Sequence, residues 1–180
     1  MKKLFIILSL IITLAVSGLI IFKFISKNTV DVTDSSKWTY ITHDEFKVRL
    51  PENLKSTTKL YSSSLGAEQI ACYKNNKIVF SVAKQQMTPD QVKNIDLKKT
   101  IQSISINGED LVPIKVNSGY YYKFTGNSAE TAGNENKLFR IEALFKGKDA
   151  IYSIAVSCPI TDRTKYEESM TQWIESFSLR

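Results

Sequence analysis

Residues that carry chemistry are scarce in this chain. Its 180 residues include one histidine, two cysteines and seven glycines. The histidine, His43, lies in the predicted turn Thr42-His43-Asp44-Glu45, where its acidic neighbours are too close along the chain to converge with it on a metal ion or in a catalytic triad. The glycines form no phosphate-binding loop, and no close carboxylate pair of the glycosidase kind is apparent. We therefore predict a protein that is not an enzyme and has no cofactor or metal site.

The charge of the chain does not indicate a nucleic-acid partner. The net charge is +6, from 24 basic and 18 acidic residues. Four of the basic residues flank the N-terminal apolar run, so the remainder carries 20 basic and 18 acidic residues, a net charge of +2. These basic residues are scattered, without the clustering that phosphate binding requires. We expect no binding of nucleic acid.

The N-terminus contains an uncharged, almost wholly apolar run from Leu4 to Phe22, with lysines on both sides. Its 19 residues would form a helix of about 28 Å, close to the roughly 30 Å thickness of the bilayer hydrocarbon. The sequence thus predicts a transmembrane helix over about 4–22, within an anchor of residues 1–27. Residues 28–37 are polar and are predicted to be a tether, and residues 38–180 have the size of a single domain.

A cleaved secretory signal is the alternative to this anchor. Ala15-Val16-Ser17 provides a small-residue cleavage site. Cleavage there would leave the apolar segment 19–22 near the new N-terminus, so we favour the uncleaved form. A long following domain is translocated largely regardless of charge. We expect a single-pass protein of a bacterial cell membrane with a cytoplasmic N-terminus and an extracytoplasmic domain; the alternative is a cleaved, secreted protein.

The domain alternates between strand and helix patterns. A helix is predicted from the Thr88-Pro89-Asp90-Gln91 capping signal to about Ser105, with Asp96 able to restart it. A second begins at a Thr161 or Thr164 cap and carries an apolar stripe from Tyr166 to Phe177. Strands are predicted over 38–42, 46–50, 60–64, 70–73, 78–84, 111–116, 120–126, 138–146 and 150–157. In the strand over 138–146, one face is predicted to be core and the other mostly polar.

Strand pairs with one helix inserted midway and one at the end predict an α+β fold, in which two helices cover one face of an antiparallel sheet. This order of elements resembles the PsbP/Mog1-like family of small domains. The residues that carry the resemblance are Phe46-Lys47-Val48-Arg49-Leu50-Pro51, the hairpin from Leu138 to Ser157, and Tyr166, Met170, Trp173, Ile174 and Ser176-Phe177. The resemblance implies a non-enzymatic binding or accessory role, but the matching motifs are apolar and transfer no functional residue.

The two cysteines, Cys72 and Cys158, leave two interpretations open. In an extracytoplasmic domain they could form a disulfide. Alternatively, they are buried reduced thiols that act as small apolar side chains, since a domain of this size needs no covalent link.

Aromatic and loop residues provide the candidate contacts. Tyr120, Tyr122 and Phe124 share one face of a strand and are predicted to be core. An exposed aromatic platform and the polar loop over 125–136 are the alternatives for binding. The contact candidates are Trp38, Tyr61, Tyr73, Tyr121, Asn127 and Asn134.

Two hypotheses for the function follow. The first is a membrane-anchored module, with the lipid bilayer and another envelope protein as its partners. The second is a binder of a small ligand or glycan in a cleft between sheet and helices.

Overall fold

The computed structural model describes residues 31–57, 67–106, 108–127 and 137–180. The predicted membrane segment from Leu4 to Phe22 and the predicted strand over 60–64 lie outside these ranges. Among the helices in the described ranges, none has the length and apolar character needed to cross a bilayer.

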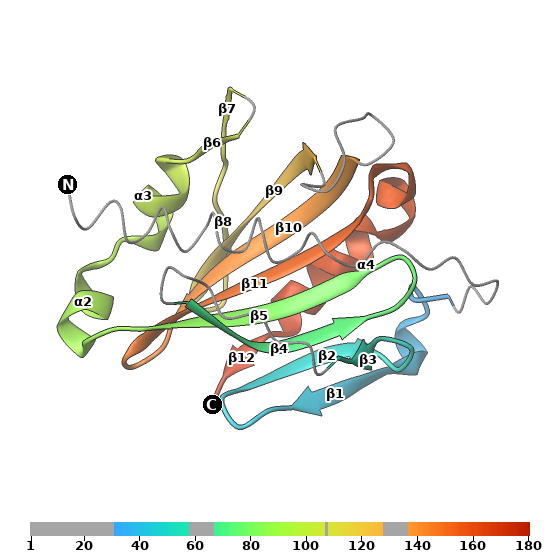
Figure 1. The fold of residues 1–180 in the computed structure, drawn as a ribbon, viewed down its shortest axis with the longest axis horizontal. Coiled ribbons are helices and arrows are strands. Elements are labelled where there is room, and N and C mark those ends of the chain that lie inside the picture. The colour runs from blue at the N-terminus through green and yellow to red at the C-terminus, as the bar shows by residue number, and fades with distance from the viewer. Residues whose placement is uncertain (1–30, 58–66, 107, 128–136) are drawn as a thin grey trace.

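The described residues form an α+β fold built on antiparallel sheets (Figure 1). The smaller sheet has the order β1-β2-β12, formed by Trp38–Thr42, Phe46–Pro51 and Ser178–Leu179. The larger sheet has the order β3-β4-β5-β11-β10-β9-β8, formed by Lys55–Ser56, Ala67–Lys74, Val79–Gln86, Ala150–Pro159, Lys137–Lys146, Gly119–Asn127 and Ile114–Val116. The predicted hairpins over 38–50, 70–84, 111–126 and 138–157 are confirmed as strand pairs, although the first strand of the third covers only Ile114–Val116.

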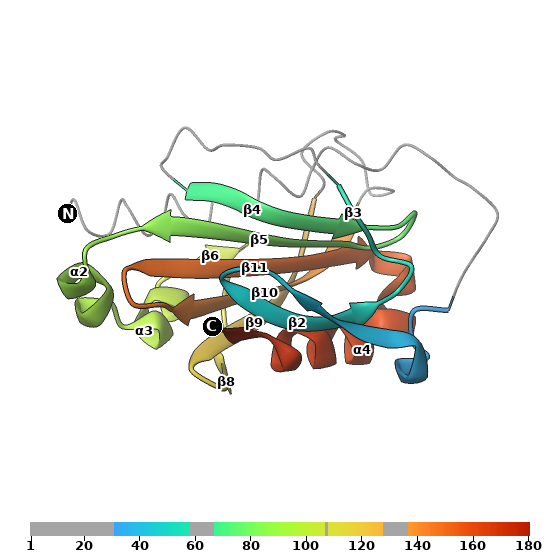
Figure 2. The same cartoon turned by 90° about the horizontal axis from the view of Figure 1, so that it is seen from below.

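Helix α4 (Arg163–Ser176) and the smaller sheet pack on one face of the larger sheet, which we call the α4 face (Figure 2). The apolar stripe of α4 is buried as predicted, and its Met170, Trp173 and Ile174 have no exposed surface. The ring of Trp173 meets that of Trp38 edge to face, with centroids 5.8 Å apart. The Trp38 indole nitrogen donates a hydrogen bond of 2.9 Å to the Val32 carbonyl, which satisfies its polar group within the core.

The short helices α2 (Pro89–Asn94) and α3 (Leu97–Gln102) pack on the opposite face, which we call the α3 face. Their core includes Tyr122, Leu144 and Ile151, whereas the α4 core contains the alternate neighbours Tyr121 and Tyr152. Because successive strand residues point to opposite faces, the two helical units lie on opposite sides of the sheet. The prediction that two helices cover one face is therefore wrong.

The capping signals had mixed outcomes. Thr88 and Gln91 form the predicted capping box of α2, and Asp96 caps α3 after a break at Ile95. Helix α4 begins after the 3-10 turn η3 (Ile160–Asp162), so that its N-cap is Asp162 and neither predicted threonine.

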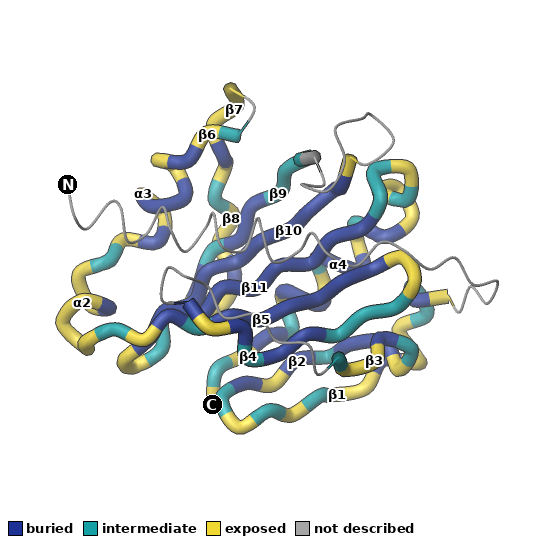
Figure 3. Tube along the Cα trace, viewed as in Figure 1, coloured by how far each residue is buried: buried dark blue, intermediate teal, exposed yellow. Residues whose placement is uncertain are grey.

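Both faces of the central strands are buried (Figure 3). Arg140 and Glu142 lie on the face of β10 that was predicted to be mostly polar, and they are only 4% and 2% exposed, so this face is buried as well. The physical reason is that these polar side chains interact with one another and with a neighbouring strand. Nη2 of Arg140 lies 3.4 Å from Glu142, and the Tyr122 hydroxyl donates to the same carboxylate.

Candidate binding cleft

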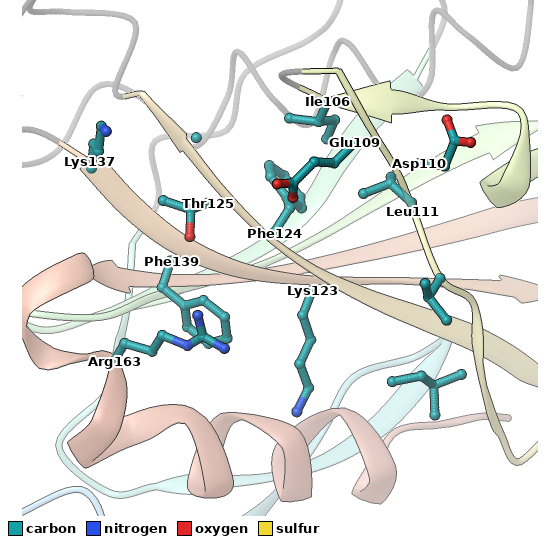
Figure 4. Close-up of a pocket in the computed structure, with 13 residues that line it drawn as sticks. Ile106, Glu109, Asp110, Leu111, Lys123, Phe124, Thr125, Lys137, Phe139 and Arg163 are labelled. Atoms are coloured by element: carbon teal, nitrogen blue, oxygen red, sulfur yellow. The ribbon is translucent and has the colours of Figure 1, made fainter.

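A cleft of about 540 Å³ lies at the outer edge of β9 (Figure 4). One wall is a segment that we call the arm: strands β6 (Ser105–Ile106) and β7 (Glu109–Asp110), together with residues 111–114. The other walls come from β9, the start of β10 and the first residue of α4. The lining residues are Ile106, Glu109, Asp110, Leu111, Val112, Ile114, Lys123, Phe124, Thr125, Gly126, Lys137, Phe139 and Arg163.

The cleft exists because β8 is short. The predicted strand over 111–116 is limited to Ile114–Val116, which pairs with Tyr121, Tyr120 and Gly119. Pro113 precedes it and has no backbone N–H with which to continue a ladder. The chain therefore leaves β9 at this point, and the backbone N–H of Leu111 instead donates to the Ile104 carbonyl at 3.2 Å.

The wall on the α4 face is basic. Lys123 Nζ lies 3.1 Å from one carboxylate oxygen of Glu167 on α4, and Arg163 Nε lies 2.7 Å from the other. Burial opposes ionisation of Glu167, but the hydrogen bonds from Arg163 and Lys123 outweigh it and lower the pKa of this carboxyl. The guanidinium of Arg163 lies over the Phe139 ring, 4.6 Å from its centroid. With the exposed Lys137, this wall holds three cations and one carboxylate.

The wall formed by the arm is acidic and apolar. Glu109 and Asp110 are exposed, and Figure 4 shows Glu109 directed toward Phe124. Ile106 and Phe124 pack partly buried against the α3 core, to which Leu111 belongs. Beyond them, Val112 is 72% exposed and Ile114 is 39% exposed. The cleft thus has a basic side, an acidic side and exposed apolar residues at one end.

A buried polar cluster supports β9 next to the cleft. Tyr122 donates a hydrogen bond of 2.5 Å to Oε2 of Glu142, and the Arg140 guanidinium lies 5.7 Å from the Phe124 ring centroid. Burial raises the pKa of Glu142, against the opposing effects of Arg140 and Tyr122. Burial, followed by the neighbouring Glu142, raises the pKa of Tyr122 well above its usual value. The Tyr122 hydroxyl is therefore a hydrogen-bond donor rather than a base at neutral pH.

The cleft offers charged and apolar side chains for contact with a ligand or partner. In the ranges that the structure describes, no group of three or more His, Cys, Asp or Glu side chains is placed to hold a metal ion. His43 lies in the turn between β1 and β2, as the sequence predicts, and its ring stacks on that of Phe46 with the ring centroids 4.7 Å apart.

The predicted contact residues are not brought together. Tyr121 and Trp38 are buried in the α4 core and Tyr73 is half-buried against it, so these three form no exposed platform. Tyr61 and Asn134 lie outside the described residues. Asn127 is the last residue of β9, close to the cleft, but its side chain is not described. Of Tyr120, Tyr122 and Phe124, which were predicted to be core, Tyr122 is fully buried, and Tyr120 and Phe124 pack partly buried against the α3 core.

The two cysteines are free, buried thiols. In the strand register, Cys158 lies opposite Phe139, and its side chain is in the core under α4. Cys72 lies opposite Ser81, which faces the other side of the sheet. Burial raises the pKa of both thiols, that of Cys158 to about 12. The structure thus agrees with the interpretation of reduced thiols and gives no support to a disulfide.

Sequence reasoning missed most of the cleft. The sequence predicts that Leu111, Val112 and Ile114 belong to one strand, and no local pattern marks Arg163 or Glu109 as residues of a cleft. Pro113 within that strand was the available signal, because a proline limits a strand to an edge or ends it.

Comparisons with known proteins identify the fold. No protein-family model and no curated protein matches the chain. The solution structure of the cyanobacterial PsbP protein (CyanoP) from Synechocystis sp. is similar, with a TM-score of 0.53 and 10% sequence identity, over 87% of this chain and 99% of that one. A structure from Bacteroides thetaiotaomicron gives a TM-score of 0.44 at 11% identity, over 75% of this chain and 45% of its own. A protein of unknown function from Pseudomonas aeruginosa gives 0.36 at 10% identity, over 79% and 97%. The resemblance to PsbP predicted from the sequence is confirmed at the level of the fold, and the described domain has a PsbP-like α+β fold.

Proposed function

We propose that this protein is a non-catalytic interaction module that is held at a bacterial cell membrane and that binds or stabilises another envelope protein through the cleft beside β9. The observation that carries the proposal is the exposed apolar end of that cleft. Val112, on the arm, is 72% exposed, and Ile114, two residues further on at the start of β8, is 39% exposed. Exposed apolar groups rimmed by charge are typical of protein-binding surfaces.

The membrane location rests on the N-terminal apolar run alone. A helix over Leu4 to Phe22 would hold the domain at the outer surface of the membrane, on a tether of residues 28–37. Protease treatment of intact cells tests this orientation. We expect the C-terminal domain to be degraded while the N-terminus stays protected, and a domain that resists protease until the cells are lysed would contradict the orientation.

Cross-linking in intact cells with an amine-reactive reagent, followed by mass spectrometry, tests the binding function. Lys137, at the cleft, and Lys148, in the β10–β11 turn, are both exposed and lie at opposite ends of β10, about 30 Å apart. We expect Lys137 to be linked to a lysine of another envelope protein and Lys148 to serve as the matched control. Equal linkage at both positions, or linkage at neither, would contradict binding at the cleft.

A second candidate is a small ligand or glycan in the same cleft. Its volume of about 540 Å³ lies within the usual range of ligand sites, roughly 300–1,000 Å³. A native mass spectrum of the purified protein distinguishes the two. A retained mass of a few hundred daltons favours the ligand, and the bare mass of the chain favours the protein partner.

A further inference from the structure

We propose that the cleft binds an extended segment of the partner protein in which acidic and apolar side chains alternate. This inference rests on the proposed function and adds the chemistry of the partner. The acidic side chains would face the basic wall formed by Lys123, Lys137 and Arg163. The apolar side chains would face Phe124 and the arm.

The strand geometry favours an extended occupant. Strand β8 occupies the outer side of β9 only at residues 119–121. In the described part of the chain, no strand pairs with the outer side of β9 at Tyr122, Lys123 or Phe124. A segment that lies in the cleft runs beside these residues, where its backbone can extend the sheet in place of β8. A lysine on an edge strand, such as Lys123, discourages indiscriminate pairing with other strands. A segment that pairs beside Lys123 therefore has to match its positive charge.

The different residues on the two faces of β9 account for the alternation of acidic and apolar side chains in the proposed segment. Lys123 pairs with Ile141 and lies on the α4 face, whereas Phe124 pairs with Arg140 and lies on the α3 face. A strand added beside them presents its own side chains alternately to these two faces. One set of side chains therefore meets cations and the other meets apolar groups.

The charged residues around the cleft determine which of the two sets of side chains in the segment is acidic. The wall on the α4 face carries Lys123, Lys137 and Arg163 against one carboxylate, Glu167, a net charge of +2 at neutral pH. On the arm, Glu109 and Asp110 repel acidic side chains from the opposite side. An acidic side chain is thus favoured toward α4 and disfavoured toward the arm. This arrangement fixes which face of the segment points toward α4.

The probe is the synthetic peptide acetyl-Ser-Glu-Val-Asp-Ile-Glu-Ser-amide with a fluorescent label, titrated into the full chain in detergent micelles. A peptide with lysine in place of its three acidic residues is the charge control. Two further peptides carry N-methyl groups on every second backbone amide, and the amides that are methylated in one peptide are unmethylated in the other. The amides of an added strand point alternately toward and away from the neighbouring strand. Only one of the two methylated peptides therefore has its methyl groups on the amides that would pair with β9.

We expect saturable binding of the acidic peptide and of one N-methylated peptide, with no binding of the lysine peptide or of the other N-methylated peptide. The double substitution Lys137→Ser/Arg163→Ser should weaken binding about tenfold, because it removes two of the three cations. The single Lys137→Ser change, at an exposed residue, should weaken it about threefold without affecting the fold. Lys148→Ser is the matched control and should leave binding unchanged.

Binding of the lysine peptide as strong as that of the acidic one, equal behaviour of the two N-methylated peptides, or no saturable binding would overturn the inference. These outcomes are distinguishable from failure of the proposed function. If Lys137 is cross-linked to an envelope protein in cells while the acidic peptide does not bind, the interaction module stands and the alternating acidic segment is wrong.

Discussion

The hydroxyl of Tyr122 on β9 lies 2.5 Å from the carboxylate of Glu142 on β10, and both side chains are almost completely buried. The two residues are directly opposite in the strand register. Phe124, two residues along β9, lines the cleft, so this hydrogen bond stabilises the strand on which the proposed binding surface depends. Its removal should therefore affect stability first and binding second.

Replacement of Tyr122 by phenylalanine should destabilise the domain by about 1–3 kcal/mol, because it removes a donor from a buried carboxyl group that cannot turn to solvent. Chemical denaturation of the two proteins measures the change. Tyr40→Phe is the matched control, since Tyr40 is 60% exposed, and its effect should lie within about 0.5 kcal/mol. Equal stability of the Tyr122→Phe and wild-type proteins would contradict the role assigned to this bond.

The raised pKa of Glu142 predicts a pH dependence of stability with a defined sign. Burial raises this pKa above its ordinary value of 4.5, so between the two values the folded protein binds a proton that the unfolded chain has released. The contribution of Glu142 to the free energy of unfolding therefore falls as the pH rises through this window. Below the ordinary value it is fully present.

Comparison with Glu142→Gln isolates this effect, since glutamine is similar in shape to the protonated acid and does not titrate. The free energy of unfolding of wild type minus that of the variant should decrease from pH 4 upward and then become constant. Because the pKa values of Glu45 and Glu167 are lowered, these residues make the free energy of unfolding rise with pH in the acid range. This contribution is the same in both proteins and cancels in the difference. A difference that rises with pH would show that Glu142 is stabilised as the anion.

Local signals predicted most of the strands and helices, whereas their assembly was harder to predict. The strand over 138–146, the Thr88 capping box and the apolar stripe from Tyr166 to Phe177 are each indicated by neighbours in sequence, and each appears in the structure. The placement of α2 and α3 on the face opposite α4 depends on contacts with Leu144 and Ile151, far away in the chain. No local pattern encodes that choice.

The candidate site was harder to predict than the fold for the same reason. Arg163, Lys123 and Glu109 come from three separate elements, and only the tertiary structure places them around one cleft. Strand parity alone did place Tyr122 and Phe124 on one side of β9 and Tyr121 on the other. It could not show that Tyr121 lies under α4 rather than in solvent.

The packing of α4 against the sheet predicts a large effect of Met170. Met170→Ala should destabilise the domain by about 2–5 kcal/mol, because the residue has no exposed surface and its loss leaves a cavity. Gln172→Ala, at an exposed position of the same helix, should change stability by less than about 0.5 kcal/mol. Thermal and chemical denaturation measure both variants, and similar effects at the two positions would show that α4 does not dock as described.

The state of the cysteines can be read from their reactivity. Cys72 and Cys158 should resist alkylation in the folded protein, since both thiols are buried and have a raised pKa. In denaturant without reductant, both should be alkylated, as mass spectrometry of the intact protein will show. Thiols that react only after a reductant is added would establish the disulfide instead.

Site-specific photo-cross-linking in intact cells tests the central claim, binding at the cleft beside β9, most directly. A photoreactive amino acid is placed at Val112, on the arm, and in a separate strain at Tyr40, which is similarly exposed but lies on the smaller sheet. We predict that the Val112 probe captures one defined envelope protein and that this product is weakened by Lys137→Ser/Arg163→Ser, whereas the Tyr40 probe does not capture it. Capture of the same protein from both positions, or of none from Val112, would contradict the account.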